Sequence, residues 1–507
     1  CSTQSNCLSV EPLETPLGRK RTINQSTCNK DFSCVKGFRP SFVTVSGQAI
    51  KNSSATSTGI SLPAIDLPQP ENRALHSPWG ILIAGVGGTG VITLGQILGI
   101  AAHMENKWIV TQDAAGLAQK GGATWSHVMI AQQEKDILTT RINTGGADLI
   151  LGSDAIVAAS KESMIFASEQ RTKVILNEHS PPTAEFILKE GWINPANSCA
   201  ESIRQLLGAD ATMHFDAHAV ALKCLGDSIY VNPIMLGYAW QKGLIPLALE
   251  TILRAFELNG VAVQQNQRAF EWGRHCAHDW ASVQAMIQES SPQLSPPSVD
   301  QVIDERIRFL KEYQNSAYAK EYEQIVSQVR EAEQTVMPES FELTQVVAKN
   351  LFKLMAYKDE YEVARLHLDR TFQSQIQKQF QGPVKISYHL APPLFASKNE
   401  RGELVKNTYG SWMRIIFRVL SHMKSLRGTR LDPFGYSHER IQERAWIAQY
   451  KDFLIQAIAS LNQDNYQQLL AIAKIPDVIK GYGHVKARHV TKAQNTWNQQ
   501  VTAWSQR

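Results

Sequence analysis

Residues 79–102, WGILIAGVGGTGVITLGQILGIAA, constrain the fold more than any other part of the chain, because they contain no charged side chain. About 20 apolar residues are enough to span a bilayer. However, seven of these 24 residues are glycines, and each glycine costs about 1 kcal/mol relative to alanine inside a helix. A strand over Ile81–Ala84, a turn over Gly85–Gly90 and a helix over Val91–Ala102 account for every glycine. We therefore predict strand, turn and helix rather than a membrane span.

The predicted turn has the spacing of an anion-binding motif. Gly85, Gly87 and Gly90 fit G-x-G-x-x-G, and backbone amides at a helix N-terminus suit a phosphate or another anion. The predicted cofactor-binding turn comprises Gly85, Gly87, Gly88, Thr89 and Gly90. Gly95 and Gly99 are expected to let the helix lie close on the sheet. The motif alone is weak evidence, since the glycines can also serve tight packing. A NAD site also needs an acidic residue that binds the ribose, and the two candidates for it are Glu105 and Asp113.

The alternation of short apolar runs with helical stretches predicts an α/β fold. ILIAG, WIVTQ, HVMIA, DLILG and KVILNE each have the pattern of a buried strand in a parallel, Rossmann-like sheet. After residue 276 the pattern becomes mostly helical, with apolar stripes such as Tyr322, Ile325 and Val329. The predicted domains are a cysteine-bearing segment (1–47), a linker (48–75), an α/β domain (76–275) and a mostly helical C-terminal domain (276–507).

A second candidate site lies in the loop after the strand WIVTQ. Lys120 is followed by Gly121 and Gly122, so a cation and two backbone amides can meet one anionic group. Gln112 and Asp113 end the strand at the carboxyl edge of the sheet, where ligands tend to lie. The alternative is a surface hairpin with a solvated lysine. His103 and His127 are expected to be surface or packing residues, and KDEYEVAR to be mostly a charged helix face.

Composition and cysteine usage limit the class of protein. Hydrophobic content of 43%, charged content of 19% and a net charge of +4 are typical of a soluble globular protein without a broad nucleic-acid-binding surface. Four of the seven cysteines (Cys1, Cys7, Cys28 and Cys34) fall in the first 34 residues. This uneven spacing favours a reducing compartment, such as the cytoplasm, and a local cysteine site. Unligated thiols and a zinc site stay open as alternatives.

Several long segments together resemble one family. GVGGTGVITLGQILGIAA, DAAGLAQKGGATWSHVMIA and NTGGADLILGSD resemble the gamma domain of 2-oxoacid:ferredoxin oxidoreductases, and most of all the long indolepyruvate ferredoxin oxidoreductase-like proteins. NLFKLMAYKDEYEVARL, LRGTRLDPFG and IKGYGHVKARH resemble the helical C-terminal region of the same proteins. The N-terminal segment resembles the cysteine-bearing junction after their thiamine-diphosphate half, although Arg39 stands where a cysteine is expected.

The resemblance implies an activity and its cofactors. Such enzymes oxidatively decarboxylate a 2-oxo acid, here an aryl one, to an acyl-CoA and pass electrons through iron–sulfur clusters to ferredoxin. This chain is expected to act with an upstream region or partner subunit that binds thiamine diphosphate and Mg, and to be inactive alone. By resemblance, a 4Fe–4S cluster takes ligands from Cys1, Cys7, Cys28 and Cys34.

The resemblance also implies roles for the loop residues and an oligomeric state. The candidate catalytic residues are Lys120, Gln112 and Asp113. Lys120, Gly121 and Gly122 are expected to contact coenzyme A or thiamine diphosphate, and the protein is expected to be a homodimer without nucleic-acid or membrane partners. Two other classes stay open. A NAD(P)-dependent oxidoreductase would use the glycine turn directly, and a non-catalytic assembly module would keep only the fold.

Overall fold

A computed structural model describes residues 9–13, 15, 20–25, 28, 30–36, 42–47, 60–71, 75–115, 122–181, 192–289, 298–380, 382–391, 405–481 and 483–506. The chain divides into two compact units. The first comprises Cys1–Leu13, Lys20–Asp31 and Asn52–Gln293, and the second comprises Glu14–Arg19, Phe32–Lys51 and Leu294–Arg507. Each unit is described by itself.

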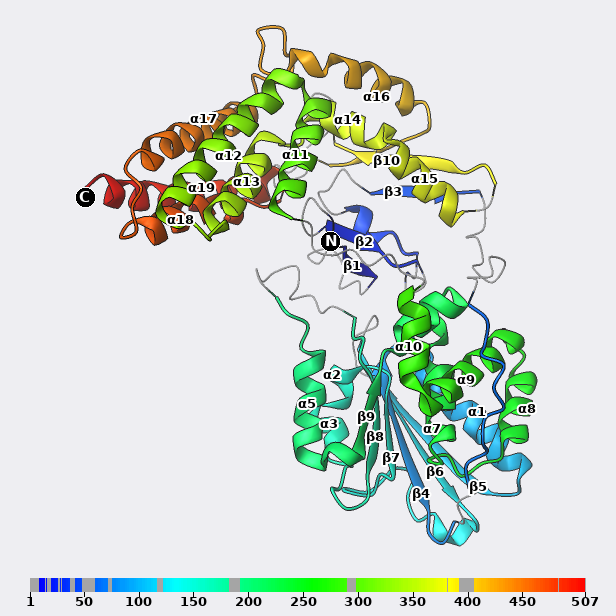
Figure 1. The fold of residues 1–507 in the computed structure, drawn as a ribbon. Coiled ribbons are helices and arrows are strands. Elements are labelled where there is room, and N and C mark those ends of the chain that lie inside the picture. Colours follow the sequence, from blue (N-terminus) through cyan, green and yellow to red (C-terminus); the bar gives the residue numbers. More distant parts are fainter. Residues whose placement is uncertain are drawn as a thin grey trace. The chain divides into compact units, whose positions relative to one another are not determined.

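A six-stranded sheet forms the centre of the first unit (Figure 1). Its strand order is β5-β6-β4-β7-β8-β9. The strands are β4 (Trp79–Val86), β5 (Trp108–Ala115), β6 (Ala123–Ala131), β7 (Leu149–Gly152), β8 (Lys173–Asn177) and β9 (Thr212–Phe215). Strand β6 is antiparallel to both β5 and β4, whereas β4, β7, β8 and β9 pair in parallel. Five strands therefore share one direction, and their carboxyl ends meet at one edge.

The expected α/β fold with a mostly helical C-terminal region is confirmed, but the expectation of a parallel sheet is wrong for β6. Only residues 116–122 separate β5 from β6. A parallel crossover needs a dozen or more residues, so this short connection allows only an antiparallel pair.

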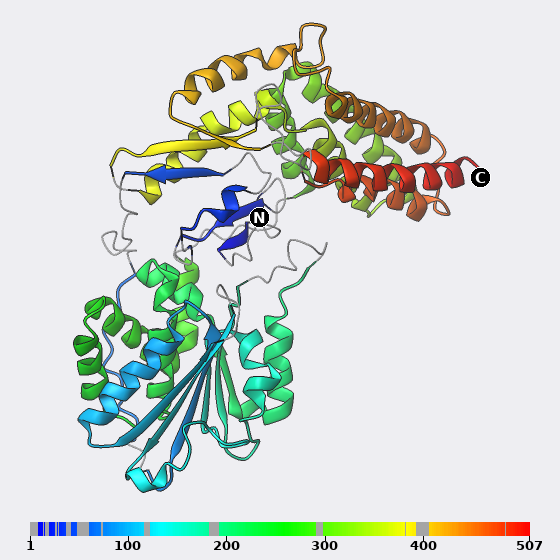
Figure 2. The ribbon, with the colours of Figure 1, turned by 180° about the vertical axis from the view of Figure 1, so that it is seen from behind.

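Helices cover both faces of this sheet (Figures 1 and 2). Ile81 and Ile83 of β4 pack on one face with residues of α1, α7, α8 and α9, whereas Leu82 and Ala84 pack on the other with residues of α2 and α5. This alternation is the period of two that a strand imposes. The helices of this unit are α1 (Val91–Met104), α2 (Ala155–Ala158), α3 (Lys161–Met164), α5 (Ala196–Leu207), α6 (Ala217–Val220), α7 (Val231–Gln241), α8 (Leu249–Asn259), α9 (Val263–His278) and α10 (Trp280–Glu289). A hairpin of β1 (Val10–Leu13) and β2 (Lys20–Ile23) also belongs to the first unit.

Two of the helices that cover the sheet cross in direct backbone contact. A Cβ atom built on Gly237 of α7 would lie 1.9 Å from the Phe270 carbonyl oxygen. A Cβ atom built on Gly273 of α9 would lie 1.9 Å from the Ile234 carbonyl oxygen. No side chain fits at either position, so α7 is held at a fixed depth against α9.

The second unit is mostly helical. Its helices are α11 (Val299–Tyr313), α12 (Ser316–Val336), α13 (Glu342–Met355), α14 (Glu360–Leu368), α15 (Arg370–Gln379), α16 (Met413–His422), α17 (His438–Ile458), α18 (Tyr466–Lys474) and α19 (Gly483–Ser505). Strands β3 (Val43–Ser46), β10 (Lys385–Leu390) and β11 (Asn407–Tyr409) form a small antiparallel sheet in the order β11-β10-β3. Ser298 and Gln301 form a capping box that begins α11. Among the described residues, no helix has the length and apolarity needed to cross a membrane.

Candidate functional site

The turn between β4 and α1 forms the centre of the candidate site. Both the amide and the hydroxyl of Thr89 donate to the Val86 carbonyl, at 3.3 and 2.7 Å. Gly88 and Gly90 have φ angles of +87° and +94°. Residues other than glycine adopt this left-handed backbone conformation at a cost of roughly 1–2 kcal/mol. The predicted strand, turn and helix are therefore confirmed, and the turn depends on glycine at these two positions.

The turn presents open backbone at the start of a long helix. Helix α1 has 14 residues and begins directly after Gly90. Its first amides have no acceptor within the helix, and the helix dipole favours an anion there. A Cβ atom built on Gly88 would meet no atom within 4 Å, so this peptide is accessible. The Gly87 amide donates to the Gly122 carbonyl at 2.8 Å, which brings the end of the Lys-Gly-Gly loop against the turn.

A buried polar network fixes the turn in place. The Asn232 side chain at the start of α7 donates to the Thr89 carbonyl at 2.6 Å. The Ser153 hydroxyl, just after β7, donates to the Asn232 side-chain oxygen. The Asn177 side chain at the end of β8 donates to the Ser153 carbonyl at 3.2 Å. Asn232 and Ser153 were not predicted from the sequence, although each is a polar residue directly beside an apolar segment.

The network lies where the order of strands changes direction. After β4 the chain passes through α1 to β5 on one side, and β7 then lies on the other side of β4. The turn at Gly87–Gly90 and the residues after β7 flank this point. In open α/β sheets, ligands bind in the crevice beyond the carboxyl ends of the strands at such a point. Both backbone geometry and topology therefore favour a ligand at this turn.

The neighbouring strand ends carry acids and histidines. Asp154 caps α2 by accepting from the Val157 amide, and burial raises the pKa of its carboxyl. His179 and His218 stack with ring centroids 3.7 Å apart. Burial, and to a smaller extent the neighbouring His179, lower the pKa of His218 to about 3. His218 is therefore a neutral packing group at pH 7 rather than a proton donor.

The predicted catalytic pair Gln112 and Asp113 lies on β5, with β6 between it and the glycine turn. Two strand spacings correspond to about 10 Å. The Gln112 side-chain oxygen accepts from the Thr140 hydroxyl at 2.8 Å, and Asp113 is exposed. Strand β5 continues to Ala115, so neither residue is the last of the strand. The structure thus brings Gly122 to the turn but does not bring this pair there.

The structure describes both predicted histidines but not the first two residues of the Lys-Gly-Gly loop. Lys120 and Gly121 lie outside the described residues. His127 is 1% exposed and packs edge-on against Phe166, as expected of a packing residue. Burial, and to a smaller extent the positive charge of Arg141, lower the pKa of His127 to about 4. His103 is exposed, as expected of a surface residue.

Glu105 cannot provide the ribose contact of a NAD site at this turn. It caps the far end of α1, about 20 Å from the turn along a helix of 14 residues. Its carboxylate accepts from Lys107 at 2.7 Å, the Thr251 hydroxyl at 2.6 Å and the Ala248 amide at 2.7 Å. Although burial raises it, these hydrogen bonds hold the pKa of Glu105 below its usual value. Glu105 therefore joins α1 to α8. Of the two acids considered for the ribose contact of a NAD site, only Asp113 is left.

The predicted metal ligands are only partly described. Cys1 and Cys7 lie outside the described residues, whereas Cys28 and Cys34 are half-buried. Within the described ranges, no group of three or more His, Cys, Asp and Glu side chains is arranged to hold a metal ion. The described cysteines alone therefore do not form a complete ligand set.

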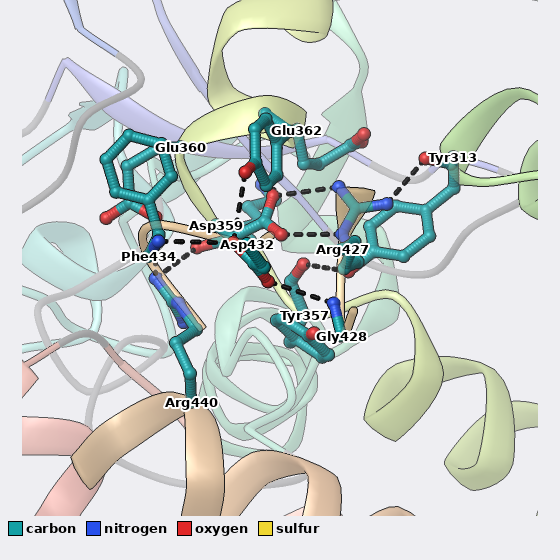
Figure 3. Close-up of polar contacts among 12 residues, drawn as sticks. Tyr313, Tyr357, Asp359, Glu360, Glu362, Arg427, Gly428, Asp432, Phe434 and Arg440 are labelled. Carbon is teal, nitrogen blue, oxygen red and sulfur yellow. Dashed lines mark hydrogen bonds and ion pairs between the residues drawn. The ribbon is translucent and has the colours of Figure 1, made fainter. Parts of the chain in front are cut away.

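A second polar cluster occupies the interior of the helical unit (Figure 3). Asp359 begins α14 by accepting from the Glu362 amide at 2.8 Å, and it forms two hydrogen bonds with Arg427 at 2.5 and 2.8 Å. Arg427 also donates to the Tyr313 carbonyl at 2.6 Å, and its guanidinium lies 3.6 Å from the centre of the Tyr313 ring. Both charged side chains are buried. KDEYEVAR was expected to be mostly a charged helix face, but Asp359 and Glu362 face the interior.

Two family models match the chain. Residues 80–276 match the family described as pyruvate ferredoxin/flavodoxin oxidoreductase. Residues 299–499 match a family of unknown function, DUF6537. The first match covers the sheet and its helices, and the second covers most of the helical unit.

Curated relatives match the same part of the chain as the oxidoreductase model. The indolepyruvate oxidoreductase subunit IorB of Methanothermobacter thermautotrophicus is 28% identical over 200 residues, which are 38% of this chain and 95% of that protein. The subunit of the same name from Archaeoglobus fulgidus is 32% identical over 202 residues, which are 38% of this chain and 92% of that protein.

One solved structure aligns with a similar share of the chain. Pyruvate oxidoreductase subunit PORC of Thermotoga maritima is 22% identical and overlaps 39% of this chain and 96% of its own, with a TM-score of 0.29.

Proposed function

Since this chain belongs to the 2-oxoacid:ferredoxin oxidoreductase family as a gamma-type member, we propose that it is the C-terminal part of an enzyme that oxidatively decarboxylates an aryl 2-oxo acid to an acyl-CoA. The thiamine-diphosphate half lies in an upstream region or a partner subunit, and this part is inactive alone. Bound thiamine diphosphate supplies the carbanion stabilisation that decarboxylation needs. The electrons released pass to ferredoxin through iron–sulfur clusters. Cys1, Cys7, Cys28 and Cys34 are the proposed ligands of one 4Fe–4S cluster.

The glycine turn at the carboxyl edge of the sheet is the observation that supports this role. Its open Gly88 peptide, the start of α1 and the Gly122 end of the Lys-Gly-Gly loop converge on one place. Together they suit the phosphate groups of coenzyme A or of thiamine diphosphate. Asn232 positions the turn through the Thr89 carbonyl, and Lys120 is proposed to add a positive charge.

The test compares two glycine-to-alanine substitutions in the complete enzyme, purified without oxygen. Gly88→Ala strains the turn, because its φ is +87°. Gly99→Ala is the matched control, since a Cβ there meets no atom within 4 Å and the residue lies within α1. The alanine turn is expected to relax out of this conformation when no anion is bound. Restoring it on binding costs roughly 1–2 kcal/mol, which corresponds to a five- to thirtyfold weaker binding of the anion. We therefore expect G88A to raise KM for coenzyme A, or the Kd for thiamine diphosphate, by that factor while G99A leaves both unchanged.

The readouts are arylpyruvate- and coenzyme A-dependent dye reduction and calorimetric titration with each cofactor. If G88A binds both cofactors as the unchanged enzyme does, the turn does not hold either of them. If the enzyme shows no turnover with any arylpyruvate but binds NADH in a way that depends on Gly88, the NAD(P) alternative replaces the proposal. A change in subunit association without a change in turnover would favour the assembly module.

A further inference from the structure

A pocket with a volume of 250 Å³ lies beyond the carboxyl ends of β8 and β9. These strands are two and three spacings away from β4, or about 10 and 14 Å, so the pocket is distinct from the glycine turn. Its lining residues directly follow the two strands or lie on α6, on the π-helical segment Ala221–Leu225 and on α10. All of them belong to the first unit, so the pocket needs no particular arrangement of the two units.

Two carboxylates line this pocket from neighbouring strands. Glu178 and Asp216 directly follow β8 and β9, and the Glu178 amide donates to the Phe215 carbonyl at 3.0 Å. One oxygen of Glu178 pairs with the His214 ring at 2.6 Å, and one oxygen of Asp216 accepts from the Ala219 amide at 2.8 Å. The second oxygen of each carboxylate has no hydrogen bond to another described residue. Two such oxygens in one pocket favour a cation that carries N–H donors.

The pocket also has an aromatic wall. Trp280 at the start of α10 packs edge-on against Phe215, with the ring centroids 5.6 Å apart. The Trp280 side chain is only half-buried, so part of its ring stays accessible in the pocket. Ala219, which is also half-buried, adds a small apolar side chain to the lining. A flat apolar group of a ligand can therefore pack against the ring.

One base and two amides complete the polar lining. Lys223 lies on the π-helical segment, and Gln284 and Gln288 lie about one turn apart on α10. None of these three side chains has a hydrogen bond or ion pair with another described residue. The ammonium of a lysine and the amide of a glutamine both donate to a carboxylate. The pocket thus offers partners for an anionic group as well as for a cationic one.

We propose that this pocket binds an α-amino acid with an aromatic side chain. The ammonium group of the ligand donates to Glu178 and Asp216, and its carboxylate accepts from Lys223. The aromatic ring of the ligand packs against Trp280. Pockets for drug-sized ligands have volumes of about 300–1,000 Å³, so a volume of 250 Å³ suits a ligand of amino-acid size. This site uses no residue of the glycine turn and goes beyond the proposed reaction.

The charges of the pocket disfavour the other classes of ligand. A simple amine would bring a second ammonium close to Lys223, and a simple carboxylic acid would face two carboxylates. Like charges placed this close weaken binding. The phosphate groups of coenzyme A or thiamine diphosphate would meet the same two acids. An amino acid, in contrast, presents an opposite charge to both the acids and the lysine.

Calorimetric titration of the full chain with L-phenylalanine tests the site, and binding is expected at about millimolar concentration or below. Two probes of similar size, 2-phenylethylamine without the carboxylate and 3-phenylpropionate without the ammonium, should each bind at least about tenfold more weakly. E178Q/D216N removes both charges but keeps an oxygen that can cap α6, and it should weaken L-phenylalanine by roughly tenfold or more. K223M should weaken L-phenylalanine but not 2-phenylethylamine, because it also removes the repulsion. The control K135M alters an exposed lysine outside the pocket and should change neither.

Circular dichroism establishes that each variant is folded before its titration is interpreted. An unchanged chain that does not bind L-phenylalanine, or a folded E178Q/D216N chain that binds it equally well, would overturn the proposal. So would 2-phenylethylamine that binds as tightly as L-phenylalanine, because the ligand would then be a simple amine. G88A should bind L-phenylalanine normally, and a loss in that variant would place the ligand at the glycine turn instead. The readout is binding, so the result does not depend on the proposed reaction.

Discussion

Replacing Arg427 with methionine is expected to destabilise the helical unit more than any exposed charge substitution. The arginine and its partner Asp359 are 4% and 3% exposed, respectively. Arg427 makes two hydrogen bonds to Asp359 and one to the Tyr313 carbonyl, and it stacks on the Tyr313 ring. Methionine fills much of the same volume but removes all three donors. It therefore leaves the Asp359 carboxylate buried without its counter-charge.

The size of the effect follows from this burial. Breaking a buried ion pair by removing one partner costs about 3–5 kcal/mol, because the remaining charge stays in a poorly solvated place. That is a large share of the roughly 5–15 kcal/mol by which a domain is stable. Asp359→Asn in the same chain removes the orphaned charge and keeps an oxygen that can cap α14. We therefore expect D359N/R427M to recover at least about 1 kcal/mol relative to R427M.

Urea unfolding followed by circular dichroism measures both effects. The matched control is Lys474→Met, because Lys474 pairs with Glu342 at 3.0 Å while both side chains are about half exposed. Such exposed pairs contribute roughly 0–1 kcal/mol. Equal losses for R427M and K474M, or a double variant less stable than R427M, would show that the buried pair does not hold the helices together.

Three further predictions concern the first unit. Gly273→Ala should destabilise it by about 3 kcal/mol, measured by thermal unfolding, because the new Cβ would lie 1.9 Å from the Ile234 carbonyl; Gly99→Ala should have no such effect. Asn232→Ala should cost about 1–3 kcal/mol in urea, since it removes the donor to Thr89 and the acceptor of Ser153. A loss no larger than that of an exposed asparagine such as Asn197 would contradict the network. Finally, stability should fall as pH decreases from about 6.5 towards 4. The unfolded chain binds a proton in this range, whereas the folded His127 has a pKa of about 4 and His218 one of about 3. The slope is at most about 1.4 kcal/mol per pH unit for each histidine, so His127→Phe should flatten it, and an unchanged slope would contradict the burial argument.

The parts of the fold predicted correctly depend on local rules. The glycine turn was predictable because only glycine suits the conformation of Gly88 and Gly90. The apolar stripe of α12 was predictable from helical periodicity, and Tyr322, Ile325 and Val329 are buried as expected. The family resemblance is likewise confirmed by the match over residues 80–276 and by the curated relatives.

The parts that were missed depend on partners distant in sequence. A buried apolar strand has the same pattern whether it is parallel or antiparallel, so the apolar pattern of β6 alone did not indicate its direction, and only the short connection from β5 did. Asn232 contacts Thr89 across 143 residues, and Asp359 contacts Arg427 across 68 residues. Periodicity within one helix cannot identify such a partner. KDEYEVAR was therefore expected to be mostly a solvated helix face, although two of its acids are buried.

The two unpredicted features of the first unit are physically linked. Helix α7 contacts α9 at Gly237 and Gly273, where neither helix has room for a side chain. The first turn of α7 carries Asn232, whose amide holds the Thr89 carbonyl of the glycine turn. A methyl group at Gly273 must therefore move α7 and pull Asn232 away from Thr89. The depth at which α7 and α9 cross thus affects the geometry of the glycine turn that Asn232 contacts. If the turn binds an anion as proposed, Gly273→Ala should weaken that binding even under conditions where the protein stays folded.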